Sequence, residues 1–121
     1  MAHKILVVED NPDNQKLVSW ILEDEGYEYK CAATGEESLS LVDEERFDMV
    51  LMDISLPGMD GKETTRKMRE RSNLKGLPII AVTAHAIKGE RESILESGVN
   101  GLITKPIDEG ELLAILQKHL F

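Results

Sequence analysis

Four short apolar runs divide the chain, and longer segments with helical patterns separate them. The runs lie at about residues 4–8, 49–52, 79–82 and 101–104. Near-continuous apolar character over so few residues is typical of parallel strands that are covered on both faces. The runs therefore predict buried strands in the interior of an α/β domain.

A fifth segment, around residues 27–31, has a period of two instead. Tyrosine and cysteine side chains at positions 27, 29 and 31 alternate with Glu28 and Lys30. This alternation predicts an edge strand with one face in water. Strands and helical patterns thus alternate five times, which predicts a doubly wound five-stranded parallel sheet with five helices on its two faces.

Capping residues indicate where the helices begin and end. Asp10 or Asn11 can cap a helix that has Pro12 in its first turn, and Gly26 ends this helix. Capping boxes pair Thr34 with Glu37, Asp60 with Glu63, and Asp108 with Glu111. We therefore expect compact βα units joined by short connections.

Size, charge and cysteine content limit the class of protein. The chain has 121 residues, which is enough for one domain, residues 1–121, with a single core and no output domain. Its formal charge of −9 disfavours nucleic acid as a partner. The single cysteine, Cys31, has no internal disulfide partner. Because no membrane span or signal peptide is evident, we expect a cytoplasmic protein that does not bind membranes.

Each of the four apolar runs leads into a chemically active side chain. Glu9 and Asp10 follow the first run, Asp53 the second, Thr83 the third and Lys105 the fourth. The carboxyl ends of parallel strands share one edge, where open α/β sheets bind ligands. Three acids, a hydroxyl and an ammonium would meet there. This set suits a divalent metal ion and a phosphoryl group held on a carboxylate.

The chemistry of such a site gives each residue a role. Asp53 is the candidate nucleophile, since a carboxylate that attacks a phosphoryl group forms an acyl phosphate. Attack on an anionic phosphate requires charge compensation, which Mg²⁺ provides. Glu9 and Asp10 offer oxygen ligands for that ion. Lys105 can contact the carboxylate first and a phosphoryl oxygen later, and the Thr83 hydroxyl can donate to the phosphoryl group.

Each of these residues also has a simpler interpretation. Asp10 fits a helix cap, Glu9 a solvated strand end and Asp53 the cap of a turn. Thr83 and Lys105 are ordinary residues at the end of a strand or on the surface. The functional hypothesis depends on their joint occurrence, because four separate strand ends all carry groups that suit one site.

The chain resembles the receiver domain of two-component response regulators over essentially all of its length. The segments that carry the resemblance are 7–11 (VVEDN), 51–61 (LMDISLPGMDG), 81–84 (AVTA) and 104–106 (TKP). The resemblance implies a flavodoxin-like, CheY-like sheet in the order 2-1-3-4-5. It also implies a cis Lys105–Pro106 bond.

By this resemblance, Asp53 takes a phosphoryl group from a phosphohistidine of a sensor histidine kinase or histidine phosphotransfer protein. Glu9, Asp10, Asp53 and the backbone carbonyl of Ser55 would hold Mg²⁺, while Thr83 and Lys105 would bind the phosphate. The domain would be a phosphorelay switch that changes partner binding. It would catalyse only its own phosphorylation and dephosphorylation, as a monomer or weak dimer, either alone or as part of a hybrid kinase.

Four positions invite further hypotheses. The family usually has Tyr or Phe at the position of Leu102, so the usual coupling from Thr83 to the surface must differ here. His85 either affects the approach of water to the phosphate or is an ordinary loop residue. Leu17 and Trp20 either form part of the kinase-docking surface, or Trp20 simply packs against a neighbouring helix.

Three rival functions fit the sequence less well. A flavin-binding module needs a loop rich in Ser, Thr and Gly after the first strand, whereas this chain has acidic Glu9-Asp10-Asn11-Pro12. An aspartyl phosphatase usually has a paired-Asp motif and a cap domain, and position 55 is Ser. A degenerate receiver that only binds partners would not need the complete acidic set.

Overall fold

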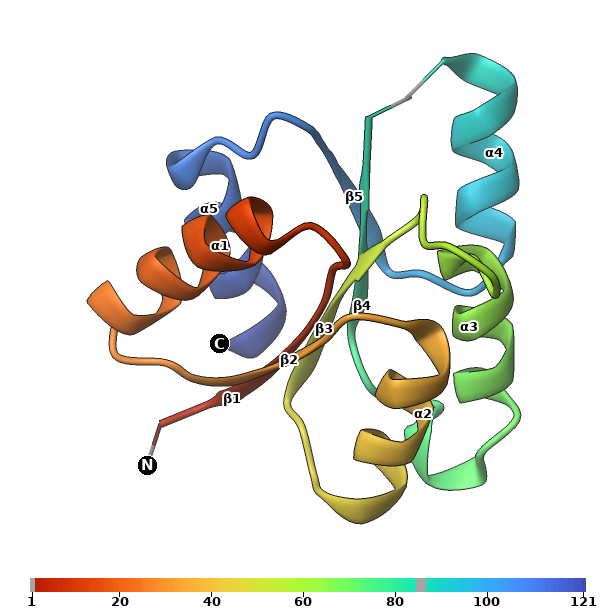
Figure 1. Cartoon of the computed structure of the whole chain (residues 1–121), viewed down its shortest axis with the longest axis horizontal. Helices are drawn as coiled ribbons and strands as arrows, with labels where there is room; N and C mark the ends of the chain where they lie inside the picture. Colours follow the sequence, from red (N-terminus) through yellow and green to blue (C-terminus); the bar gives the residue numbers. More distant parts are fainter. Residues whose placement is uncertain (1, 85–86) are drawn as a thin grey trace.

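The computed structural model describes residues 2–84 and 87–121, and it consists of a parallel sheet between two layers of helices (Figure 1). The strands are β1 (Lys4–Val8), β2 (Glu28–Ala32), β3 (Met49–Asp53), β4 (Ile79–Thr83) and β5 (Gly101–Thr104). Their order in the sheet is β2-β1-β3-β4-β5, and every neighbouring pair is parallel. The predicted fold class and strand order are confirmed.

The helices follow the strands in alternation. They are α1 (Pro12–Asp24), α2 (Gly35–Glu44), α3 (Gly61–Arg69), α4 (Lys88–Glu96) and α5 (Glu109–Leu120). A short 3₁₀ helix, η1 (Ser72–Leu74), was not predicted. Figure 1 shows α1 and α5 on one face of the sheet and α2, α3 and α4 on the other. His85 lies outside the described residues, so the hypothesis about it stays a prediction.

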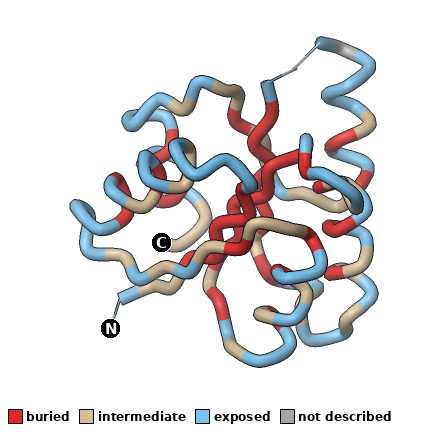
Figure 2. The backbone as a smooth tube through the Cα atoms, viewed as in Figure 1, coloured by how far each residue is buried: buried red, intermediate tan, exposed pale blue. Residues whose placement is uncertain are grey.

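The core has two main halves because successive strand residues point to opposite faces. Ile5 and Val7 of β1 pack in a cluster with residues of α1 and α5. Leu6 and Val8 pack in a second cluster with residues of α2 and α3. Figure 2 shows this burial concentrated in the central strands. Continuous apolar runs are therefore required where both faces are covered.

The two edge strands are less buried than the central ones. In β2 the exposed side chains of Glu28 and Lys30 alternate with partly buried neighbours, as the period of two predicts. In β5 only Ile103 is fully buried, although this run is also apolar. The reason is position, since β5 forms the other edge of the sheet.

Polar side chains cap the helices at the expected places. Asn11 caps α1, because its Oδ1 accepts hydrogen bonds from the N–H groups of Asp13 and Asn14 at 2.9 and 3.2 Å. Thr34, Asp60 and Asp108 each accept a hydrogen bond from the backbone N–H three residues further on. The choice between Asp10 and Asn11 is thus resolved in favour of Asn11.

Among the described residues, no helix has both the length and the apolar composition needed to cross a bilayer.

Candidate functional site

The carboxyl edge of the sheet brings together an acidic cluster. One carboxylate oxygen each from Glu9, Asp10 and Asp53 lies within 4.8 Å of the other two. Asp53 is only 2% exposed and Glu9 is similarly buried, whereas Asp10 faces solvent. Buried carboxylates so close together repel one another, so the cluster favours a bound cation. The candidate acids therefore lie in one place.

Strand register explains why these residues meet. Val8 of β1 pairs with Met52 of β3, so Glu9 and Asp53 follow paired residues. Asp53 pairs in turn with Val82, and Thr83 pairs with Thr104. The chemically active residues on neighbouring strands therefore lie at nearly the same height along the strand direction, within about one residue of one another.

Lys105 lies between two of the acids. Its Nζ is 3.1 Å from Glu9 Oε1 and 3.2 Å from Asp53 Oδ2. Burial alone lowers the pKa of the ammonium, but the hydrogen bond from Lys105 to Glu9 and the negative charge of Asp53 outweigh it and leave the pKa of Lys105 raised. Lys105 is therefore a fixed positive charge that offsets part of the acidic cluster.

The surroundings of Glu9 disfavour its charged form. Burial raises the pKa of Glu9, and the nearby Asp53 carboxylate raises it further. The Asn11 backbone N–H, 3.1 Å from Glu9 Oε2, and the Lys105 ammonium act in the opposite direction. A divalent cation at this position would favour the charged form of Glu9.

The Asp53 side chain is held on both of its oxygens. Oδ1 accepts a hydrogen bond from the Ser55 backbone N–H at 3.1 Å, and Oδ2 accepts one from Lys105. The loop after β3 thus folds back on the carboxylate, with the Ser55 side chain exposed. This arrangement fixes the direction in which the carboxylate faces the acidic cluster.

Gly61 has a role that the sequence analysis did not assign. The first residue of α3 lies directly against the backbone of Asp53, and its N–H donates to the Ile54 carbonyl at 3.0 Å. A Cβ at position 61 would overlap the Asp53 carbonyl oxygen and lie 2.7 Å from Ile54 Cα. Only glycine fits this close approach. Its place directly after the cap Asp60 was the one available signal.

Thr83 and Leu102 occupy neighbouring strand ends. Thr83 is buried, and its carbonyl accepts a hydrogen bond from the Lys105 backbone N–H at 2.7 Å, which ties the end of β4 to the end of β5. Leu102 packs against a small cluster formed by Ile54, Ala81 and Ile94. The Lys105–Pro106 bond is cis, as expected.

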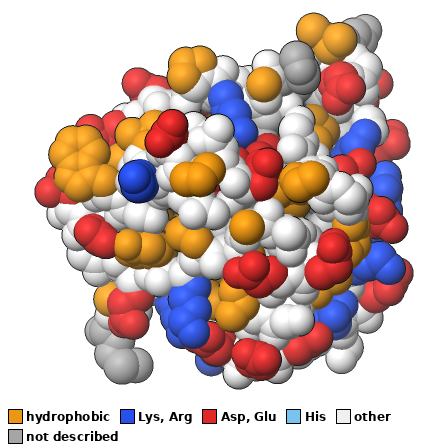
Figure 3. Space-filling view, in the orientation of Figure 1, with side chains coloured by type: hydrophobic (Ala, Val, Ile, Leu, Met, Phe, Trp, Pro, Cys, Tyr) orange, Lys and Arg blue, Asp and Glu red, His pale blue; other side chains and the backbone are white. Residues whose placement is uncertain are grey.

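An exposed apolar surface lies on α1. Trp20 is 67% exposed and Leu17 is 37% exposed, so the alternative in which Trp20 packs against a neighbouring helix is wrong. Figure 3 shows hydrophobic side chains over α1, at the left of the view. A shallow hollow beside Trp20 is lined also by Tyr29 and Cys31.

Comparison with known proteins identifies the family. The fold and the acidic edge define a CheY-like signalling domain. Residues 5–117 match the response regulator receiver domain. The chain therefore belongs to the receiver domain family of two-component and phosphorelay signalling.

The relatives include both long kinases and short regulators. Sensor protein GacS of Pseudomonas syringae pv. syringae is 42% identical over 120 residues, which are 97% of this chain but 13% of GacS. The polar-differentiation response regulator DivK of Brucella anthropi is 38% identical, with 99% of this chain and 98% of DivK covered. The chain thus spans a small part of the first relative and nearly all of the second.

A solved structure is similar over the whole domain. The receiver domain of the sensor histidine kinase PA1611 from Pseudomonas aeruginosa PAO1 matches with a TM-score of 0.93 and 39% identity, covering 99% of this chain and 98% of that one. That domain has a magnesium ion coordinated in its active-site cleft.

Proposed function

We propose that the chain is a phosphorelay switch that accepts a phosphoryl group on Asp53 from a phosphohistidine of a sensor histidine kinase or histidine phosphotransfer protein. The observation that carries this proposal is the meeting of Glu9, Asp10 and Asp53 within 4.8 Å, with Lys105 in contact with two of them. A purely structural strand edge has no need for such a concentration of charge.

The donor set suits Mg²⁺. Three carboxylates and one ammonium leave an excess of negative charge, and hard carboxylate oxygens are the ligands that Mg²⁺ prefers. We assign Glu9, Asp10, Asp53 and the backbone carbonyl of Ser55 as its ligands. The magnesium ion in the active-site cleft of the PA1611 receiver domain supports a magnesium site here. When bound, the ion offsets the charges of the phosphoryl oxygens and of the attacking carboxylate.

The transfer itself is a displacement at phosphorus. An Asp53 carboxylate oxygen forms a bond to phosphorus while the P–N bond of the phosphohistidine breaks, and the imidazole leaves with the electron pair and takes a proton from water. Lys105 shifts from the Asp53 carboxylate to a phosphoryl oxygen, and the Thr83 hydroxyl donates to another. Attack of water at phosphorus later restores Asp53 and releases phosphate. The chain thus catalyses only its own phosphorylation and dephosphorylation.

Phosphorylation would change partner binding through the later helices. The new group adds nearly two negative charges, which favours a conformation with Thr83 closed on the phosphate. The cluster of Ile54, Ala81, Ile94 and Leu102 joins the residue after Asp53 to α4. We infer that this aliphatic cluster carries the change that an aromatic residue would carry at position 102 in the scheme usual for the family.

The surface and length of the chain support further assignments. Leu17 and Trp20 form the proposed docking surface for the kinase or phosphotransfer protein, since exposed Trp is enriched in binding hot spots. The match over 98% of DivK supports a receiver domain that acts on its own, and we propose that it does so in the cytoplasm as a monomer or weak dimer. The GacS match keeps the alternative of a hybrid-kinase receiver.

Incubation with acetyl phosphate tests the phosphoacceptor. We expect intact-mass spectrometry to show addition of one phosphoryl group only when Mg²⁺ is present. Asp53→Ala should abolish the addition, whereas Asp24→Ala, at an exposed position on α1, should leave it unchanged. Undiminished addition to Asp53→Ala would contradict the proposal.

A further inference from the structure

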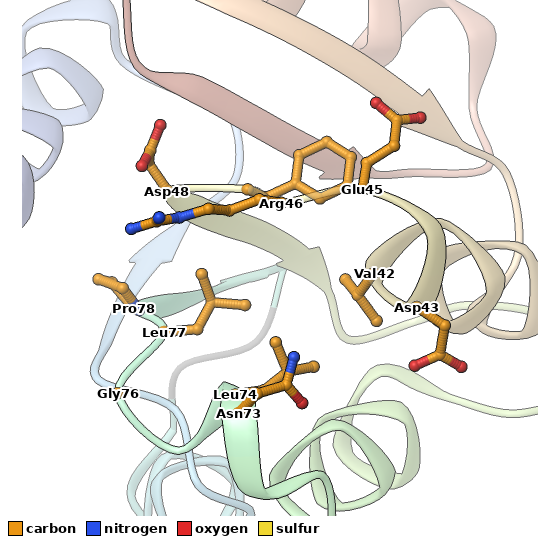
Figure 4. A pocket seen from close by; sticks show the side chains of 11 residues that line it. Val42, Asp43, Glu45, Arg46, Asp48, Asn73, Leu74, Gly76, Leu77 and Pro78 are labelled. Atoms are coloured by element: carbon orange, nitrogen blue, oxygen red, sulfur yellow. The ribbon is translucent and has the colours of Figure 1, made fainter.

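A pocket lies at the amino ends of the strands, at the opposite end of the sheet from Asp53. Its volume is about 530 Å³, and it is enclosed by the end of α2, the connection into β3 and the segment between η1 and β4 (Figure 4). Asp48 and Pro78, which line it, directly precede β3 and β4. The pocket therefore lies at the amino ends of the strands whose carboxyl ends carry Asp53 and Thr83. It shares no residue with the acidic site.

The floor of this pocket is formed by apolar side chains. Val42, Phe47 and Leu77 line it, and all three belong to the buried core cluster between the sheet and helices α2 and α3. Figure 4 shows Val42 and Leu77 facing the centre of the pocket. These side chains are 5–9% exposed, and that narrow apolar surface can contact an apolar group of a ligand.

Two of the three acids on the rim are paired with cations, and the third accepts a backbone hydrogen bond. Asp43 accepts two hydrogen bonds from the Arg71 guanidinium, at 2.7 and 3.0 Å. Glu45 forms ion pairs with lysines of β1 and β2, and Asp48 accepts a hydrogen bond from the backbone N–H of Lys4 at 2.8 Å. In Figure 4 the three carboxylates point away from the centre of the pocket. These contacts hold the three carboxylates in place on the walls.

Hydrogen-bond donors lie on two opposite rims of the pocket. Arg46 is exposed and forms no ion pair within residues 2–84 and 87–121. Figure 4 shows its side chain along one rim and the Asn73 amide on the other, with Leu77 between them. The planar guanidinium of arginine matches a carboxylate with two parallel hydrogen bonds. The pocket thus combines an apolar floor with an anion-binding rim.

We propose that this pocket binds a small amphipathic carboxylate. The apolar body would lie on Val42, Phe47 and Leu77, and the carboxylate would bind the Arg46 guanidinium. The volume falls in the range of roughly 300–1,000 Å³ that is usual for small-molecule sites. Because the chain has a net charge of −9, attraction of an anion is only local, and the apolar floor must supply part of the affinity. Short polar carboxylates should therefore bind poorly.

An NMR titration with octanoate tests this site. We expect saturable amide shifts in the ¹⁵N-labelled chain that are centred on residues 42–48 and 73–78. At equal ionic strength, acetate and octylamine should bind at least about tenfold more weakly, because one lacks the apolar body and the other the negative charge. Equal binding of octylamine, or shifts centred on Asp53 and Lys105, would overturn the proposal.

Two variants locate the binding residues. Arg46→Ala should weaken octanoate binding about tenfold, as expected for loss of a charge-assisted pair. Gly76 lines the pocket, and a Cβ there meets no atom within 4 Å, so Gly76→Leu should fold and block the pocket. Gly89→Leu, at another open glycine, is the matched control and should retain binding. Undiminished binding by a folded Gly76→Leu would also overturn the proposal.

Discussion

The Lys105 ammonium lies 3.2 Å from the Asp53 carboxylate, although 52 positions separate the two residues in the chain. The contact exists because β3 and β5 end at the same edge of the sheet, on either side of β4. Lys105 also contacts Glu9 at 3.1 Å, so one cation serves two buried acids. A metal ion entering the cluster would share these acids with the lysine.

This sharing predicts that Lys105→Met binds Mg²⁺ more tightly. Loss of the ammonium removes a like charge from the site, and we expect an affinity gain of about threefold to tenfold by isothermal titration calorimetry. Phosphorylation by acetyl phosphate should become slower, because the phosphoryl oxygens lose a cation. Lys118→Met, at an exposed position on α5, is the control. Unchanged magnesium affinity in Lys105→Met would contradict the prediction.

Gly61→Ala should destabilise the domain by about 1–3 kcal/mol, because the added methyl group overlaps the backbone of Asp53. Urea unfolding followed by circular dichroism measures this change. Gly89→Ala adds a methyl group to open space in α4 and should leave stability equal or slightly higher. If both variants unfold at the same urea concentration, the close contact between Gly61 of α3 and the Asp53 backbone is contradicted.

Arg69 connects the end of α3 to two loops. Its guanidinium donates to the Gly98 carbonyl at 2.9 Å, the Leu74 carbonyl at 2.7 Å and the Asn100 side chain at 2.7 Å, and burial lowers its pKa. Arg69→Ala should cost about 2–3 kcal/mol, since polar acceptors lose their donor. The same denaturation experiment on Arg66→Ala, an exposed arginine of α3, should show little change. Equal stability of the two variants would rule out the connection.

Trp20→Ala should impair binding to the phosphoryl donor protein without impairing the phosphorylation reaction itself. Because Trp20 is 67% exposed, its removal should change stability by less than about 0.5 kcal/mol. Labelling by acetyl phosphate should be normal, while phosphotransfer from a phosphohistidine protein should slow. Phe121→Ala, at an even more exposed aromatic residue, is the control. Normal transfer to Trp20→Ala would remove this residue from the docking surface.

Most of the fold follows from the sequence pattern, because buried parallel strands need continuous apolar runs and helices need caps. The predicted positions of the strand ends were less accurate. Asp53 and Thr83 are polar, yet both belong to their strands, since they continue the ladder beyond the apolar run. The helix η1 has only three residues and no side-chain cap, so no pattern indicated it.

The site was predictable to the extent that it depends on strand ends. Parallel topology alone brings the groups at positions 9, 53 and 105 to one edge. The close approach of Gly61 and the hydrogen bonds of Arg69 depend instead on how α3 lies against the sheet and its loops. A local pattern does not contain that information. The partial exposure of Trp20 did follow from helix periodicity, at about 100° per residue.

Mapping the phosphoryl group to a single residue tests the central claim most directly. After reaction with acetyl phosphate and Mg²⁺, borohydride reduces an aspartyl phosphate to homoserine, and peptide mass spectrometry locates it. We predict homoserine at position 53 and at no other aspartate. Homoserine at Asp10 or elsewhere, with position 53 still aspartate, would contradict the assignment of Asp53 as the phosphoacceptor.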